Sequence, residues 1–235
     1  MALFSRRRDK DEASSAKDQT EPQGEQRNSA EQESAKGPWD SRDFSEDEVT
    51  RIDLGSLRIP VVDGMQLRFE AAQPGADIAA VSLVLGGSLM SLRVMAAPRS
   101  ESLWDEVRQE LTAMITEQGG DVTVADGNFG RELKTVVIAV DQSGKQARHD
   151  LRLVGWDGPR WMLRADFLGP AATSAEAAEA LEEVLSGIVV HRDDVPRPPR
   201  EALPIHPPGQ APGPEAEDLP GLDPLAPGPT IAEVR

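Results

Sequence analysis

The fold is decided by the stretch His149-Asp-Leu-Arg-Leu-Val-Gly-Trp-Asp-Gly-Pro-Arg-Trp-Met-Leu-Arg-Ala-Asp-Phe-Leu-Gly169. Apolar and charged residues alternate in its two arms, and a period of two residues is typical of β-strands. The alternating apolar residues are Leu151 and Leu153 in the first arm and Trp161, Leu163, Ala165 and Phe167 in the second. Between the arms, Asp157-Gly158 supplies the positive φ that a tight turn needs, and Pro159 cannot donate a ladder hydrogen bond. The stretch therefore predicts a β-hairpin.

Strand-like runs flank this hairpin on both sides. The upstream runs are Leu57–Val62, Met65–Ala71, Ile78–Leu85 and Ser88–Ala96. We expect these four strands to form an antiparallel meander, because turns that contain glycine or proline connect them. Further strands are expected at Val122–Val124, Leu133–Val140 and Ile188–Val190.

Two segments have the apolar spacing of an amphipathic helix. The first begins near Leu103, where Ser100 or Ser102 can cap it, and stops at Gly119-Gly120. The second follows Thr173-Ser-Ala-Glu176, which we interpret as a capping box. Together these elements predict an α+β fold with a mainly antiparallel sheet of about six to eight strands and two amphipathic helices.

The whole chain of 235 residues carries a formal net charge of −16. Its apolar residues are concentrated in the middle. Residues 1–36 lack apolar periodicity and predict a disordered acidic and polar arm. We expect a single α+β domain at residues 37–192. Residues 193–235 hold 12 of the 19 prolines and predict an extended tail. The first part of this tail, to about residue 208, could lie against the domain through Leu203-Pro-Ile205.

Several features favour a cytoplasmic location. Arg6-Arg7-Arg8 resembles the start of an export signal, but acidic residues follow it instead of an apolar stretch. No run approaches the roughly twenty apolar residues that a membrane span needs. The absence of cysteine suits a reducing compartment. Because net negative charge repels phosphate backbones, we expect no nucleic-acid binding.

The sequence lacks the usual signatures of catalysis and cofactor binding. No glycine-rich loop is followed by Lys-Ser or Lys-Thr, so a phosphate-binding loop is not expected. No serine stands in a nucleophile-elbow pattern. The histidines His149, His191 and His206 are scattered, whereas a metal site needs convergent ligands. We therefore predict no catalytic residues, no metal and no cofactor.

One cluster of the hairpin is a candidate binding site. Arg152, Arg160 and Arg164 could lie on one face of the hairpin, next to Trp161. Guanidinium groups suit carboxylates and phosphates, so this face could bind an anion or an acidic peptide. The competing interpretation, which we favour, is that the arginines are neutralised by cross-strand pairing. The acidic residues available for this pairing are Asp150, Asp157 and Asp166.

Several motifs taken together resemble a known bacterial family. They are Phe4-Ser-Arg-Arg-Arg8, Gly37-Pro-Trp-Asp40, Leu54-Gly-Ser-Leu-Arg-Ile-Pro60, Asp157-Gly-Pro-Arg-Trp-Met-Leu-Arg164 and Leu203-Pro-Ile205. From about Gly37 to Pro208 the chain is similar to an actinobacterial family known only as a domain of unknown function. The resemblance implies a cytoplasmic bacterial protein. It implies no activity, catalytic residue or cofactor.

Two classes of function fit these observations. The first is a non-enzymatic adaptor or accessory module that binds a protein partner. The second is an enzyme or small-ligand carrier with a pocket between the sheet and the helices, lined by Arg160, Arg164, Trp161 and Trp104. A deep pocket with convergent titratable groups would favour the second, and a filled core the first. Nucleic-acid contact through Arg6-Arg7-Arg8 is the weakest alternative, and the sequence leaves the partner and the oligomeric state open.

Overall fold

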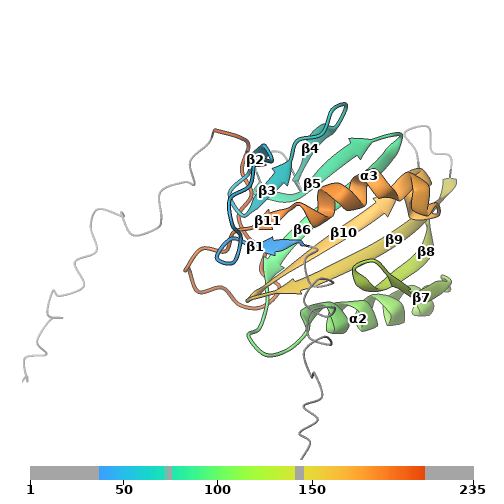
Figure 1. Cartoon of the computed structure of the whole chain (residues 1–235). Coiled ribbons are helices and arrows are strands. Elements are labelled where there is room, and N and C mark those ends of the chain that lie inside the picture. The colour runs from blue at the N-terminus through green and yellow to red at the C-terminus, as the bar shows by residue number, and fades with distance from the viewer. Residues whose placement is uncertain (1–36, 72, 74–75, 141–145, 210–235) are drawn as a thin grey trace, which may run out of the picture. The chain divides into compact units, whose positions relative to one another are not determined.

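The larger of two sheets contains the predicted hairpin near its middle. The computed structural model describes residues 37–71, 73, 76–140 and 146–209, and these residues form two sheets and two α-helices (Figure 1). The larger sheet is antiparallel, and its strands lie in the order β4 (Gln66–Ala71), β5 (Ile78–Leu85), β6 (Ser88–Ala96), β10 (Trp161–Leu168), β9 (Gln146–Gly158), β8 (Gly130–Val140) and β7 (Val122–Gly127). The predicted α+β fold is confirmed.

A smaller, mixed sheet joins segments from both ends of the described chain. Its strands lie in the order β1 (Trp39–Asp40), β11 (Val189–Val190), β3 (Leu57–Pro60) and β2 (Arg51–Asp53). Only the β1–β11 pair is parallel within this sheet. The prediction that the run Leu57–Val62 belongs to the meander is wrong, because β3 pairs with β11 and β2. Leu57 and Ile59 are fully buried in the main core, so β3 packs against the larger sheet and does not extend it.

The two helices cover opposite faces of the larger sheet. Because neighbouring residues of a strand point to opposite faces, β10 contributes Leu163 to the main core and Met162 to a second core. Helix α3 (Ala175–Ser186) and the smaller sheet line the main core, and α2 (Leu103–Glu117) lines the second. The hairpin is therefore buried on both faces. This burial includes polar residues, since Arg152 and Asp166 are only 7% and 6% exposed.

The turn of the hairpin differs from its prediction by two residues. Gly158 pairs with Trp161, so Pro159 and Arg160 form the loop, and the positive φ of 64° belongs to Arg160. A Cβ atom at Gly158 would lie 2.1 Å from the ring of Trp161. Only glycine fits at this position, because the ring packs directly against the backbone. Asp157 instead accepts hydrogen bonds from the first N–H groups of α2, those of Leu103 and Trp104, both at 3.1 Å.

Serine side chains cap both helices. The Ser102 hydroxyl accepts from the N–H of Asp105 at 3.1 Å, so one of the two predicted caps of α2 is confirmed. Helix α3 begins after a short 3₁₀ turn, η1 (Gly169–Ala172), and its cap is Ser174. The predicted capping box is wrong by one residue, because the N–H of Thr173 already donates to Pro170 in the preceding turn. Glu176 is therefore too close to the cap to complete the box.

The segment that follows β11 lies along the end of β6. The N–H of Ala96 donates to Glu201 at 2.8 Å, and that of Leu203 donates to Val94 at 3.0 Å. Strand β5 does not reach this end of β6, so the segment takes its place. Leu203 and Ile205 are buried in the main core.

Some predictions lie outside the described residues. These are the predicted disordered arm at residues 1–36 and the predicted tail beyond Gly209. In the part of the chain that the structure describes, no helix has the length and apolar character needed to cross a membrane.

Candidate functional site

The three arginines of the hairpin do not share a face. Arg152 pairs with Phe167 in the sheet register and therefore points to the α3 side. Arg164 pairs with Gly155 and points to the α2 side, and Arg160 lies in the loop. The predicted common face is wrong because a two-residue loop pairs each even-numbered residue of one arm with an odd-numbered residue of the other, which puts Arg152 and Arg164 on opposite faces.

Arg152 forms a buried cluster between β8, β9 and α3. Its Nε donates to Glu132 at 2.8 Å, its Nη1 lies 2.6 Å from Glu182, and its guanidinium lies 5.1 Å from the ring centre of Phe167. Burial opposes the charged form, but the hydrogen bonds and charges of the two glutamates outweigh it and raise the pKa of Arg152. The glutamate partners come from β8 and α3 and not from the aspartates proposed as partners. Arg152 thus holds α3 on the sheet.

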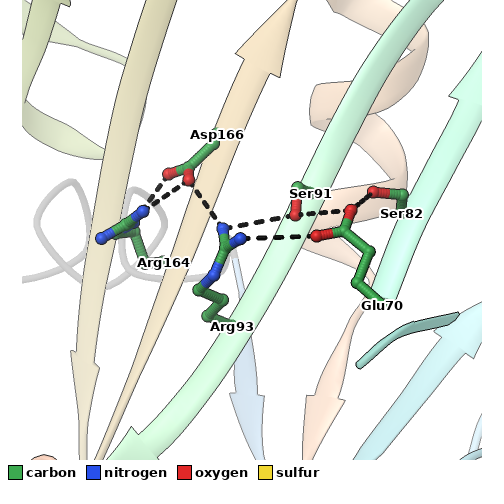
Figure 2. Close-up of polar contacts among 6 residues, drawn as sticks. All are labelled: Glu70, Ser82, Ser91, Arg93, Arg164 and Asp166. Carbon is green, nitrogen blue, oxygen red and sulfur yellow. Dashed lines mark hydrogen bonds and ion pairs between the residues drawn. The ribbon is translucent and has the colours of Figure 1, made fainter. Parts of the chain in front are cut away.

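Arg164 lies on the face of the sheet that α2 covers, because its partner Gly155 packs against Trp104. Figure 2 shows the second network, to which Arg164 belongs. Its Nε and Nη2 donate to the two carboxylate oxygens of Asp166 at 2.7 and 2.6 Å. Arg93 on β6 donates to the same carboxylate at 2.8 Å. The expected neutralisation by Asp166 is therefore present, although the pair lies within one strand and does not cross the hairpin.

The network continues across two more strands through Glu70 (Figure 2). Nη2 of Arg93 lies 3.4 Å from Glu70 on β4. The hydroxyl groups of Ser82 on β5 and Ser91 on β6 donate to the other oxygen of Glu70. The charged groups shown in Figure 2 all have partners, so this face is a satisfied polar surface of four neighbouring strands.

A different cluster of arginines forms where β1 and β11 end. Because these strands are parallel, the chain leaves both at the same end of the smaller sheet. The N–H of Ser41 donates to Val190 at 2.9 Å, and the Ser41 hydroxyl lies 3.1 Å from Nδ1 of His191. The surface depression here, which we call the arginine depression, is lined by Ser41, Arg42, His191, Arg192, Asp193, Asp194 and Val195.

Trp161 brings the loop of the hairpin to this depression. Its Nε1 donates to the buried carboxylate of Asp40 at 2.7 Å, and the N–H of Arg42 donates to the other oxygen at 2.9 Å. Arg160 precedes Trp161 directly and does not line the depression, but its positive charge is near enough to lower the pKa of Arg192. Trp161 itself is 1% exposed and supports the site from within the core.

Arg192 is the unusual member of this group. It is 5% exposed, and within the described residues its Nε and Nη1 are buried without a hydrogen-bond partner. Burial lowers the pKa of Arg192, as do the nearby positive charges of Arg160, Arg197 and Arg42, while Asp193 opposes the shift. Buried polar groups are nearly always paired, so two unpaired donors on one guanidinium need an explanation.

The other arginines near the depression have acidic partners or lie in the loop. Arg42 lies 3.5 Å from Asp194, and Arg197 lies 2.6 Å from Asp193. Arg160 forms no ion pair with any residue that the structure describes. Within the described residues neither Arg160 nor Arg192 forms an ion pair, although the carboxylates of Asp193 and Asp40 lie close to this cluster.

The sequence indicated only part of this site. Arg160 and Trp161 were expected among the binding residues, but Arg42, His191 and Arg192 were not. The signal that could have found Arg192 is the arginine-rich run Arg192-Asp-Asp-Val-Pro-Arg-Pro-Pro-Arg200, which follows an apolar strand directly. Trp104, named for the alternative pocket, packs in the second core, and its Nε1 donates to Arg131 at 2.7 Å. The described residues contain no group of His, Asp and Glu side chains arranged to hold a metal.

Comparison with known proteins identifies a family but no activity. Residues 37–213 match the model of a family described as "Protein of unknown function (DUF3710)". No curated protein and no solved structure matches the chain. The match covers the helices and strands of both sheets, and more than half of the 235 residues. The chain therefore belongs to the DUF3710 family.

Proposed function

We propose that the chain is a non-enzymatic adaptor module that binds a protein partner, and that the arginine depression receives an acidic group of that partner. The observation that carries the proposal is Arg192, whose buried guanidinium has two donors without a partner among the described residues and lies near the positive charge of Arg160. Guanidinium groups with free donors are typical recognition elements for carboxylates and phosphates. The proposal keeps the cytoplasmic, actinobacterial setting that the sequence and its resemblance imply.

The packing of the two cores supports a binding module over a ligand carrier. Apolar side chains from both sheets and α3 fill the main core, and those of α2 fill the second. Arg164, which was a candidate for the internal pocket, is engaged with Asp166. The arginine depression lies at the surface, where a protein partner can reach it without opening the fold.

Affinity capture with matched variants tests this function. The full-length chain and its Arg192→Gln and Arg68→Gln variants would be used as bait, and captured proteins would be identified by mass spectrometry. Arg68→Gln removes the same charge from an exposed position on β4, outside the depression. We expect at least one partner to be lost with Arg192→Gln and kept with Arg68→Gln. Equal capture by all three folded proteins would exclude the arginine depression as the docking point.

A further inference from the structure

We infer that the chain forms a dimer with a second copy of itself through β4, the open edge of the larger sheet. β4 is the last strand on its side of the sheet, and no described residue pairs with its outer edge. Every second residue of an edge strand directs its N–H and C=O outward, where another strand can bind them. This dimer goes beyond the proposed function, because β4 contributes no residue to the arginine depression.

The geometry of the strand limits how two copies of β4 can pair. Two antiparallel edge strands of one continuous sheet are related by a two-fold axis perpendicular to that sheet. Such an axis keeps each side chain on its own face, so it passes through a residue and not between two residues. The residue on the axis faces its own copy, and residues at equal distances on either side face one another. The short strand Gln66-Leu-Arg-Phe-Glu-Ala71 therefore allows only a few registers.

Charge selects one of these registers. Arg68 and Glu70 are the only charged residues of β4, and they flank Phe69. With Phe69 on the axis, Arg68 of each copy faces Glu70 of the other copy, and opposite charges that face each other stabilise a strand pair. With Arg68 or Glu70 on the axis, identical charges face each other, and with Leu67 there Arg68 faces Gln66. The register centred on Phe69 is therefore favoured.

The contacts within one copy leave room for this pairing. Arg68 is exposed, its Nη2 lies 3.4 Å from the side-chain oxygen of Gln66, and it forms no ion pair with a described residue. Two serine hydroxyls donate to one oxygen of Glu70, while the other oxygen lies 3.4 Å from Arg93 (Figure 2). A carboxylate has about four acceptor positions, so this second oxygen can accept a further donor. The polar network of Figure 2 then continues into the second copy.

Phe69 adds an apolar contact on the other face of the sheet. It pairs with Val81, a residue of the main core, and is itself 37% exposed. On the axis, the two Phe69 rings lie next to each other, and aromatic cross-strand pairs stabilise a sheet. The irregularity in the pairing of β4 with β5 lies beyond Glu70, so the part of β4 that forms this register is regular.

The opposite edge of the larger sheet lacks this complementarity. Its edge strand is β7, and Asp126 is the only charged residue there. No register of two β7 strands can therefore pair opposite charges. This difference makes β7 a matched control for β4.

Sedimentation of the full-length chain over about a hundredfold range of concentration tests for the dimer. We expect a reversible equilibrium between monomer and dimer. Phe69→Lys should weaken the dimer by at least about tenfold, because like charges replace the aromatic pair on the axis. Val124→Lys makes the same change at a residue of β7 that is 45% exposed, and it should leave the dimer unchanged.

Three results would overturn the inference. The first is a chain that stays monomeric at all concentrations. The second is equal weakening by Phe69→Lys and Val124→Lys when both variants are folded by circular dichroism. The third is growth beyond the dimer, because pairing of β4 with β7 of the next copy forms open chains.

Single cysteines test the register, because the chain has no cysteine of its own. Phe69→Cys places two Cβ atoms about 4.5–5.5 Å apart across the axis, close to the separation that a disulfide spans. It should therefore form a disulfide-linked dimer under mild oxidation. Arg68→Cys is the control, since its two copies are diagonal neighbours about 7–8 Å apart and should link more slowly. Faster linking through Arg68→Cys would overturn the register centred on Phe69.

Paired variants separate this dimer from the proposed function. Arg192→Gln should lose a captured partner but dimerise as the wild-type chain does. Arg68→Gln should weaken the dimer, because each charge pair loses its guanidinium, but should keep the captured partner. If capture is lost only with Arg192→Gln and no variant forms dimers, the proposed function stands and the dimer fails. If dimers form through Phe69 but capture does not depend on Arg192, the dimer stands and the proposed function fails.

Discussion

Arg152 and Arg192 are buried to nearly the same extent, at 7% and 5% exposed, but their surroundings are opposite. Arg152 lies between two glutamates and above an aromatic ring. Arg192 has two donors without partners in the described part of the chain, and other arginines close by. The difference teaches that burial of a charge does not by itself mark a functional residue. What distinguishes a structural arginine from a candidate ligand-binding one is whether the fold already supplies its counter-charge.

The two arginines should therefore contribute to stability with opposite signs. Taking a guanidinium out of water is costly, and only well-placed acids offset the cost. Glu132 and Glu182 provide this offset for Arg152. Each unsatisfied buried donor of Arg192 costs about 1–3 kcal/mol, which a bound anion would relieve.

The largest effect is expected from Trp161→Ala. Trp161 binds Asp40 and so stabilises the region around Arg192. The change opens a cavity in the main core and leaves the buried carboxylate of Asp40 without its indole donor. We expect the free energy of unfolding to fall by about 4–5 kcal/mol, as measured by urea denaturation. Trp161→Phe should cost less because it keeps most of the ring volume. An unchanged midpoint for Trp161→Ala would show that the ring does not support the core.

Arg152→Met should give the next largest effect. It tests how much the buried ion pairs of Arg152 contribute to stability. It leaves Glu132 and Glu182 facing each other without a guanidinium, although Lys134 still lies 3.2 Å from Glu132. We expect a loss of about 3 kcal/mol in the free energy of unfolding. The double variant Arg152→Met, Glu132→Gln should recover part of this loss, because one buried negative charge is removed. A loss under about 1 kcal/mol would place Arg152 among ordinary surface arginines.

Arg192→Met should have the smallest effect and sharpens the comparison most directly. Methionine fills the same apolar space as the stem of the arginine but brings no unpaired donors. We expect the free energy of unfolding to rise by about 1–2 kcal/mol, because the substitution removes the two unpaired buried donors together with the charge. Thermal and urea denaturation in phosphate-free buffer would measure it. A loss as large as that of Arg152→Met would mean that Arg192 is a structural residue, and the comparison would fail.

Periodicity predicted the long elements of the fold well. The runs at Ile78–Leu85 and Ser88–Ala96 became β5 and β6 with the expected bounds, and the hairpin formed as a β9–β10 pair. Strands β1 and β2 were missed because two or three residues are too few to show a period. The assignment of β3 to the smaller sheet was missed. Its alternation of apolar and polar residues predicts a strand but does not tell which sheet the strand joins.

The site was harder to predict than the fold. Arg160 and Trp161 were found because they are adjacent in a hairpin that local sequence specifies. Ser41 and His191 are 150 residues apart and meet only through the parallel pairing of β1 and β11. Arg152 was expected at a surface, since alternation alone does not tell that helices cover both faces of the sheet. The unpaired state of Arg192 depends on these long-range contacts, so no local pattern encodes it.

The segment Glu201–Leu203 also has a consequence for the behaviour of the chain in concentrated solution. At the end of β6 that β5 leaves free, Val94 and Ala96 would otherwise present unpaired N–H and C=O groups to other molecules. Such an open strand edge is a template for intermolecular pairing and aggregation. The segment forms hydrogen bonds with Val94 and Ala96 and so covers this edge. We expect this cover to prevent edge-to-edge pairing between the sheets of two molecules at β6.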